Sequence, residues 1–473
     1  MVIISNRRRR SRVVTIGPQK IGGSWPIVPQ SMLSVPLSEP QKCLEQIDQL
    51  LGAGCFLIRA AIPTSRSLKD FELVRSAISE KNAAFIADLQ FGSELALLAL
   101  DLFDKVRINP GNFATTRRLA ASDYDEEIFL REKDSVEGQA KKFFQKAHRL
   151  RRAVRIGSNG GSISARMEWN CGRGVGAIIG GAIEMAQWAL EENFHSLVFS
   201  FKSSGVFQTI EANILARKRM DELGWDYPFH LGVTEAGKGF RGRAAATIGC
   251  GTLLSHGLGD TLRVSLTEAP AAEINFAQKL LAFCEKTPIP FPAKAHATAR
   301  IVDAPPDGHG VSVPAGRKPF DGDQYLLETS HLLLGSGDFD SVFIAPGANR
   351  SERREIVETL LQTCGFGKFS TEIIACPTCG RTAYDVAAVV DEISAKIGRY
   401  PGLRIAVMGC VVNGVGEMGD ADYGYIGCGN GTVNLYCRGE CAMRSIPEKN
   451  AVDELMKLME IDGNCDLKNS SGT

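Results

Sequence analysis

The chain has 473 residues, too many for one ordinary hydrophobic core, and this length indicates two or three domains. Acidic and basic residues balance at 54 each, which excludes a general attraction to nucleic acid or to an anionic membrane. The longest apolar stretch is interrupted by Glu184, which argues against a membrane span, and 13 cysteines without a secretory signal favour reduced thiols. We therefore expect a soluble protein of the cytosol, in which any polyanion is held by a local cluster of charge.

Short apolar, β-branched runs recur between residues 25 and 266, with helical segments between them. They read PIVPQSM, CFLIRAA, AFIADLQ, KVRINPG, AVRIGSN, SLVFSFK, FHLGVTE and DTLRVSL. Eight such units in about 250 residues are typical of a (β/α)8 barrel, and continuous apolar strands suit a sheet that is covered on both faces. The preceding VVTIGPQKIGG, with its glycine turn, predicts a small hairpin against the barrel.

The carboxyl ends of barrel strands converge on one mouth, where catalytic residues lie. Five of the predicted strands bring a cation to this rim, and these cations would repel one another unless an anion lay among them. Guanidinium forks and one ammonium suit a small polyanion with more than one phosphate, and Asp88 and Glu235 are available for proton transfer or hydroxyl binding. The predicted rim residues are Gln30, Ser31, Arg59, Asp88, Arg107, Asn109, Arg155, Asn159, Lys202, Glu235, Arg263 and Ser265.

The composition changes after a helix predicted at 270–286. Residues 288–319 are rich in proline, which is typical of an inserted, partly irregular segment, and some order returns in YLLETSHLLLG, DSVFIAPG and SERREIVETLLQTCG. From about residue 371, strand-like and helix-like runs alternate and predict a small α/β domain. The cysteines of this domain fall at strand ends.

Three of these cysteines have the spacing of metal ligands. Cys376 and Cys379 form the CxxC pair of ACPTCGRT, and Cys410 lies in the glycine-rich GCVVNGVGE. A zinc knuckle would explain the CxxC pair, but the next pair, Cys437 and Cys441, lies much farther along the chain and leaves Cys410 over. Scattered core thiols would not explain two glycine turns that carry cysteine.

An iron–sulfur cluster accounts for all three cysteines, with the fourth iron bound by a weaker ligand than thiolate. Glu417 lies on the same loop as Cys410 and offers a carboxylate. A carboxylate can yield to substrate, much as catalytic zinc sites keep one exchangeable position. Three cysteines and a carboxylate therefore favour chemistry at the iron, and structural zinc remains the alternative.

Several stretches together carry a family resemblance: QSM, VRINPGN, RIGSNGGS, GVTEAG, DTLRVSL, CPTCGRT, GCVVNGVGE and GDADYGYIG, in order over roughly residues 12–287 and 366–460. In these stretches the chain resembles the 4-hydroxy-3-methylbut-2-enyl diphosphate synthases of the methylerythritol phosphate route to isoprenoids. The resemblance implies a phosphate-binding TIM barrel joined to a small α/β, ferredoxin-like domain that carries a [4Fe-4S] cluster. It also implies a two-electron reductive dehydration that opens the ring of 2-C-methyl-D-erythritol 2,4-cyclodiphosphate.

The resemblance further assigns roles. Cys376, Cys379, Cys410 and Glu417 are expected to bind the cluster, and Glu235 to act as the acid/base group near the reacting carbon. The five rim cations, with Asn109, Asn159 and Ser265, are expected to hold the diphosphate, and Asp88 to contact a hydroxyl or orient a cation. Ferredoxin or flavodoxin is the expected electron donor. A homodimer follows as well, since in the family the cluster domain of one subunit closes over the barrel of its partner.

Some positions depart from the family pattern. Gln90 stands where the family usually has histidine, Val415 replaces a usual proline, and the QSMLSVPL segment with Gln30 and Ser31 lacks the usual Thr/Asn-rich wall. A paralogue acting on another phosphorylated polyol, and a zinc-stabilised phosphate-binding barrel without redox chemistry, are the alternatives. The predicted organisation is a tail and hairpin at 1–24, the barrel at 25–287, the inserted segment at 288–355, the cluster domain at 356–460 and a tail at 461–473.

Overall fold

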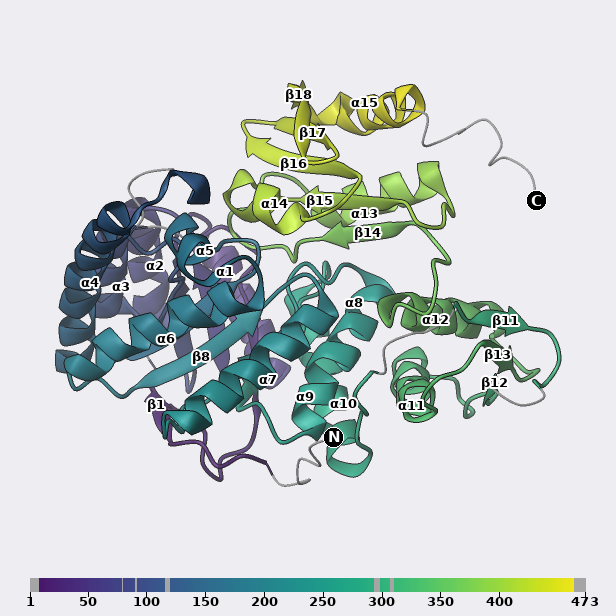
Figure 1. Ribbon diagram of the computed structural model, residues 1–473, viewed down its shortest axis with the longest axis horizontal. Coiled ribbons are helices and arrows are strands. Elements are labelled where there is room, and N and C mark those ends of the chain that lie inside the picture. The colour runs from purple at the N-terminus through teal and green to yellow at the C-terminus, as the bar shows by residue number, and fades with distance from the viewer. Residues whose placement is uncertain are drawn as a thin grey trace.

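The structure, a computed structural model, describes residues 8–78, 80–89, 92–114, 120–292, 298–306 and 310–462. Figure 1 shows three parts: a barrel drawn in purple to teal, a green α/β unit at its side, and a yellow-green domain above the barrel. Within the described ranges no helix is long and apolar enough to cross a membrane.

The barrel predicted from the sequence is confirmed. Its strands are all parallel and follow the order β8-β7-β6-β5-β4-β3-β10-β9, and a bridge between Phe199 and Phe229 joins the two ends of this order. The strands are β3 (Val28–Met32), β4 (Leu57–Ala61), β5 (Ala84–Asp88), β6 (Lys105–Ile108), β7 (Ala153–Asn159), β8 (Leu197–Lys202), β9 (His230–Leu231) and β10 (Thr261–Leu262). The helices are α1 (Pro40–Gly52), α2 (Ser65–Ala77), α3 (Ser93–Leu102), α4 (Glu126–Arg149), α5 (Ala165–Cys171), α6 (Val175–Glu191), α7 (Val206–Glu222), α8 (Gly239–Ala246), α9 (Thr252–Ser255) and α10 (Pro270–Lys286).

A hairpin of β1 (Val14–Ile16) and β2 (Gln19–Ile21) covers the amino ends of the barrel strands. Its apolar side chains pack against inward-facing residues near the starts of the strands, among them Leu57, Ala84 and Val198. This end of the barrel is therefore sealed by an apolar plug, and the opposite end carries the polar side chains.

The segment expected to be partly irregular forms a compact α/β unit. Its strands β11 (Arg300–Val302), β13 (Ser341–Ile344) and β12 (Gly310–Val313) make a parallel sheet in that order, with helices α11 (Gly322–Gly335) and α12 (Arg350–Thr363). Helix α12 runs across residue 355, where the sequence had suggested a boundary. Both helices pack on α8, and α11 also packs on α10, so the unit is fixed to the side of the barrel.

The C-terminal domain has its own mixed sheet in the order β14-β15-β16-β17-β18. Strands β14 (Glu372–Ala375), β15 (Arg404–Met408) and β16 (Tyr423–Gly429) are parallel, whereas β17 (Thr432–Cys437) and β18 (Glu440–Pro447) continue antiparallel. Helices α13 (Val386–Ile397), α14 (Val411–Met418) and α15 (Glu448–Ile461) complete the domain. Because β14 and β15 are parallel neighbours, the residues that follow them, Cys376 and Cys410, emerge at the same edge of the sheet.

Candidate active site

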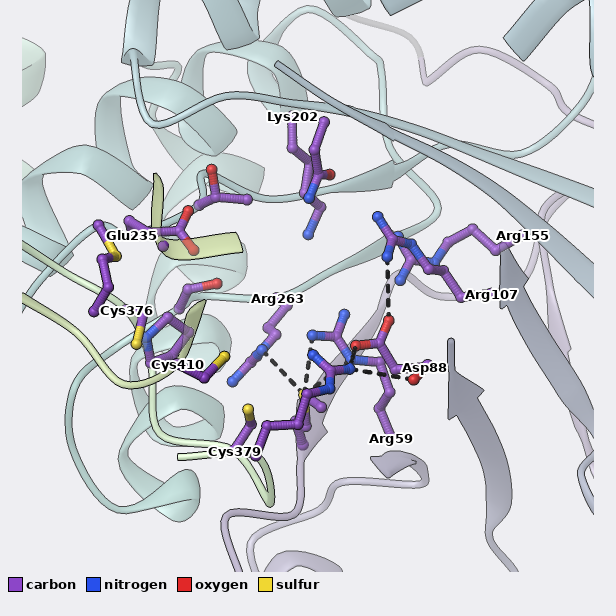
Figure 2. Close-up of a pocket in the computed structure, with 18 residues that line it drawn as sticks. Arg59, Asp88, Arg107, Arg155, Lys202, Glu235, Arg263, Cys376, Cys379 and Cys410 are labelled. Atoms are coloured by element: carbon purple, nitrogen blue, oxygen red, sulfur yellow. Dashed lines mark hydrogen bonds and ion pairs between the residues drawn. The ribbon is translucent and has the colours of Figure 1, made fainter. Parts of the chain in front are cut away.

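A cavity lies where the C-terminal domain covers the barrel mouth, and Figure 2 shows side chains from both parts meeting in it. The barrel contributes Met32, Arg59, Asp88, Arg107, Arg155, Asn159, Lys202, Thr234, Glu235, Arg263 and Ser265. The C-terminal domain contributes Cys376, Pro377, Cys379, Arg381, Met408, Cys410 and Gly414. Most of the residues predicted from strand ends and cysteine spacing therefore face one space.

A glycine on β7 and another just after β9 make room for the long basic side chains. A β-carbon on Gly157 would lie 2.8 Å from Arg107 Nε, and one on Gly232 would lie 2.4 Å from Lys202 Nζ. Carbon and nitrogen atoms do not approach this closely without a bond. Any larger residue at either position would displace a cation from the barrel mouth.

Three of the lining cations are paired with carboxylates. Asp88 accepts from Arg381 Nη2 at 2.5 Å and lies 3.5 Å from Arg107 Nη1. Arg263 donates to Glu273 of α10 at 2.8 and 3.0 Å. Burial would raise the pKa of Asp88, but the guanidinium groups of Arg59, Arg381 and Arg107 outweigh it and hold that pKa below its usual value.

The other three cations are held by uncharged partners. Arg59 donates to the Met32 sulfur at 3.0 and 3.1 Å, Arg155 donates to Ser200 Oγ at 2.6 Å, and Lys202 Nζ lies 3.2 Å from His230 Nε2. Burial lowers the pKa of all three, that of Arg59 to about 10. Among the described residues that line the cavity, six cations thus face two carboxylates, Asp88 and Glu235. Such an excess is stable only with an anion among the cations.

Two buried carboxyl groups lie side by side: Glu235, which lines the cavity, and Glu417 next to it. Glu417 Oε1 lies 3.5 Å from Asn159 Nδ2, and its Oε2 accepts from Thr234 Oγ1 at 3.2 Å. Burial raises the pKa of both carboxyls, and proximity to Glu235 raises the pKa of Glu417 further. Glu235 has a positive φ of 50°, and its Oε2 has no hydrogen-bond partner within the described ranges.

The three candidate cysteines come from two turns of the C-terminal domain. Cys376 and Cys379 follow β14, and Cys410 follows β15 as the residue that precedes α14. The Cys376 sulfur accepts the Gly409 N–H at 3.2 Å, and the Cys379 N–H donates to Thr382 Oγ1 at 3.0 Å. Figure 2 shows the three sulfur atoms on the side of the cavity that faces Glu235 and Arg263.

The donor set suits a cluster better than a single ion. In the part of the chain that the structure describes, no three His, Cys, Asp or Glu side chains converge closely enough to hold one metal ion. A cubane cluster has a different requirement, because each cysteine binds a separate iron and the sulfurs stand correspondingly farther apart. Three thiols that line one cavity, with an N–H donated to one sulfur, fit such a group.

The C-terminal domain covers the barrel of its own chain. Arg381 reaches Asp88, Thr267 Oγ1 donates to the Cys376 carbonyl at 3.2 Å, and Ala236 forms a parallel bridge with Ala375. The closest approach is between Gly161 and Gly416, where a β-carbon on Gly416 would lie 1.8 Å from the Gly161 carbonyl oxygen. The family resemblance implied that a partner subunit supplies this cover, whereas here one chain brings both halves of the site together.

Three predicted rim residues are buried but do not line the cavity. Ser31 donates to Glu273 at 2.6 Å, so it braces the partner of Arg263. Asn109 donates to Ser162 Oγ at 3.0 Å and accepts from the Gly111 N–H, so it shapes the following loop. Gln30 lies within the barrel, and its side-chain amide has no partner in the described part of the chain. Gln90, singled out as a departure from the family, lies outside the described residues.

Four residues of the site were not predicted from the sequence: Arg381, Met32, Thr234 and His230. Arg381 is buried between Asp88 and the cysteine thiols, and these raise its pKa against the effect of burial. Its only sequence signal is its position two residues after Cys379. The other three are short or neutral side chains that act on a charged neighbour, and a search for charged strand ends passes over them.

Comparison with known proteins agrees with this geometry. Residues 11–278 match the family model described as the GcpE TIM-barrel domain, and residues 372–461 match the GcpE protein C-terminal domain. A 4-hydroxy-3-methylbut-2-en-1-yl diphosphate synthase (ferredoxin) of Picosynechococcus sp. is 32% identical over 462 residues, covering 96% of this chain and 93% of the relative. The synthase of the same description from Gloeobacter violaceus is 33% identical over 459 residues, covering 96% and 95%. The chain therefore belongs to the GcpE family of 4-hydroxy-3-methylbut-2-en-1-yl diphosphate synthases.

Proposed function

We propose that this chain opens the ring of 2-C-methyl-D-erythritol 2,4-cyclodiphosphate and releases 4-hydroxy-3-methylbut-2-enyl diphosphate in isoprenoid biosynthesis. The reaction takes up two electrons and a proton, and it breaks two C–O bonds: one opens the ring, and the other releases a hydroxyl as water. The observation that carries the proposal is the meeting of three thiols and six cations in one cavity. The relatives' names support the same activity.

The cofactor of the proposal is a [4Fe-4S] cluster held by Cys376, Cys379, Cys410 and Glu417. When bound, such a cluster would supply electrons and one Lewis-acidic iron whose ligand can be exchanged. The chain provides the thiols on two short turns and places Glu417 against Asn159 and Thr234 of the barrel. As a cluster ligand, Glu417 would thereby contact both the cofactor and the barrel residues beside the substrate.

The barrel residues bind and orient the substrate. The diphosphate fits among Arg59, Arg107, Arg155, Lys202 and Arg263, with Asn159 and Ser265 beside them, because the cavity has more cations than carboxylates. Asn109 supports this wall through its loop. Asp88 orients Arg107 and Arg381. Glu235 is the proposed acid for the departing hydroxyl, since it lines the cavity and has one oxygen without a protein partner.

Ferredoxin is the proposed electron donor because the relatives are named as ferredoxin-dependent, and flavodoxin is the alternative. A homodimer remains a prediction from the family resemblance, and a cytosolic location remains one from the sequence composition. Light scattering of the purified protein tests the dimer. A mass of one chain would contradict the dimer but not the proposed active site, because one chain completes that site.

The test is an assay of metal content followed by turnover, on protein purified without oxygen. About four irons and four acid-labile sulfides per chain are expected of one cubane. Reduced ferredoxin and the cyclodiphosphate should then give the linear diphosphate product. One zinc without sulfide would overturn the mechanism. A cluster-loaded protein that leaves the cyclodiphosphate unchanged would mean that the substrate is another phosphorylated polyol.

A further inference from the structure

Lys202 is the one ammonium among the described lining residues, and a buried chain of neutral groups holds it. Its Nζ lies 3.2 Å from His230 Nε2, and His230 Nδ1 lies 2.8 Å from Thr261 Oγ1. The three residues stand on β8, β9 and β10 and are 4%, 0% and 0% exposed. His230 and Thr261 do not line the cavity, so they reach its contents only through Lys202.

Hydrogen-bond chemistry fixes the state of the histidine. A diphosphate bound among the cations keeps Lys202 protonated against the effect of burial. The resulting ammonium has three N–H donors and no acceptor, so Nε2 accepts from it, and the imidazole proton lies on Nδ1 and donates to the Thr261 hydroxyl. An imidazolium would place a second buried charge beside Lys202, and burial together with Lys202 lowers the pKa of His230. His230 is therefore a neutral acceptor for one N–H of Lys202.

Arg263 and Lys202 differ in the charge of their buried partner. Glu273 takes two hydrogen bonds from Arg263 and cancels its charge. His230 takes one hydrogen bond from Lys202 and cancels nothing, so the full charge and two N–H groups remain for an anion. Gly232, which directly follows β9, leaves the space that the ammonium occupies.

We propose that His230, oriented by Thr261, is a positioning residue that fixes the Lys202 ammonium for the diphosphate without neutralising it. This inference rests on the proposed function and adds a determinant of substrate affinity outside the cavity lining. It implies that the charge of the residue at position 230 matters more than its size.

Two substitutions of similar length separate charge from hydrogen bonding. His230→Gln keeps a neutral acceptor for Lys202, whereas His230→Glu keeps an acceptor but adds a negative charge. We expect His230→Glu to weaken binding of inorganic pyrophosphate by about tenfold or more, and to raise KM for the cyclodiphosphate similarly with a smaller change in kcat. His230→Gln should stay within about threefold of the unsubstituted protein in both measurements. His195→Gln is the matched control, because His195 is exposed near the amino end of β8.

Thr261 provides a second test if His230→Glu does not fold. Thr261→Val removes the hydroxyl and should weaken pyrophosphate binding. Thr261→Ser keeps the hydroxyl and should bind pyrophosphate as the unsubstituted protein does. Equal binding by the Gln and Glu variants, equal binding by the Val and Ser variants, or a loss confined to kcat would overturn the inference. Pyrophosphate titration needs no turnover. Failure of the unsubstituted protein to convert the cyclodiphosphate would therefore count against the proposed function and leave the inference to be decided by binding.

Discussion

Replacing Gly416 with alanine should disturb the closed arrangement of the site without altering either half of it. The new β-carbon would lie 1.8 Å from the Gly161 carbonyl oxygen and 2.9 Å from the Gly161 carbonyl carbon. An ordinary contact between carbon and oxygen needs more than 3 Å, so α14 and the loop after β7 must separate by about 1 Å or more. Glu417, the next residue, would then lose its contacts with Asn159 and Thr234.

A misplacement of about 1 Å at a catalytic site costs on the order of 100-fold in rate, or about 2.7 kcal/mol. We expect kcat/KM for the cyclodiphosphate to fall by about this factor, measured with a ferredoxin reducing system under anaerobic conditions. Iron and sulfide content should be retained, because Gly416 lies within α14, whereas the three cysteines lie on the turns before it. Gly416 has no positive φ, so alanine adds no backbone strain of its own.

Gly138→Ala is the matched control. Gly138 lies within α4, no atom stands within 4 Å of a β-carbon built there, and alanine favours the helix. Its turnover should equal that of the unsubstituted protein. Unchanged turnover of Gly416→Ala would refute the reasoning, since it would show that the approach of Gly161 and Gly416 does not hold the catalytic arrangement.

Three further predictions concern the same cavity. Mixing an Arg155→Ala chain with a Cys376→Ser chain should restore no activity, because each chain closes over its own barrel; recovery toward a quarter of normal turnover would instead indicate closure between subunits. Asp88→Asn should lower the melting temperature and enlarge the stabilisation by pyrophosphate, because the anion replaces the lost carboxylate, while Asp391→Asn at an exposed ion pair should change neither. Glu417→Ala should keep much of its iron but lose turnover, whereas Cys376→Ser should lose iron and sulfide; normal turnover of Glu417→Ala would contradict its proposed role.

The barrel was predictable because buried parallel strands have continuous apolar runs, and each such run ends at the same mouth. The runs that end at Lys202 and Glu235 illustrate this, since the first charged residue after the apolar stretch faces the cavity in both. Strand alternation, applied more strictly, would have separated Gln30 from Ser31. These neighbours point to opposite faces of β3, and Ser31 reaches α10 rather than the barrel interior.

Other parts of the site depend on contacts between distant segments and have no local signal. Arg381 meets Asp88 across 293 positions of sequence, and the pairing depends on how the C-terminal domain settles on the barrel. The fold of the inserted unit was not predicted, because its prolines suggested an irregular chain. Its short strands nevertheless pair around β13, which lies between β11 and β12 and buries Val342 and Ile344 on one face.

The inserted unit also determines how often the two halves of the site meet. It is fastened to the barrel through α8 and α10, and α12 leads within a few residues to β14. The turns that carry Cys376, Cys379 and Cys410 are thus tethered at a short, defined distance from the mouth, where their effective concentration far exceeds any concentration of free protein. Closure becomes a unimolecular step, and the specific activity of the enzyme should stay constant as the protein is diluted.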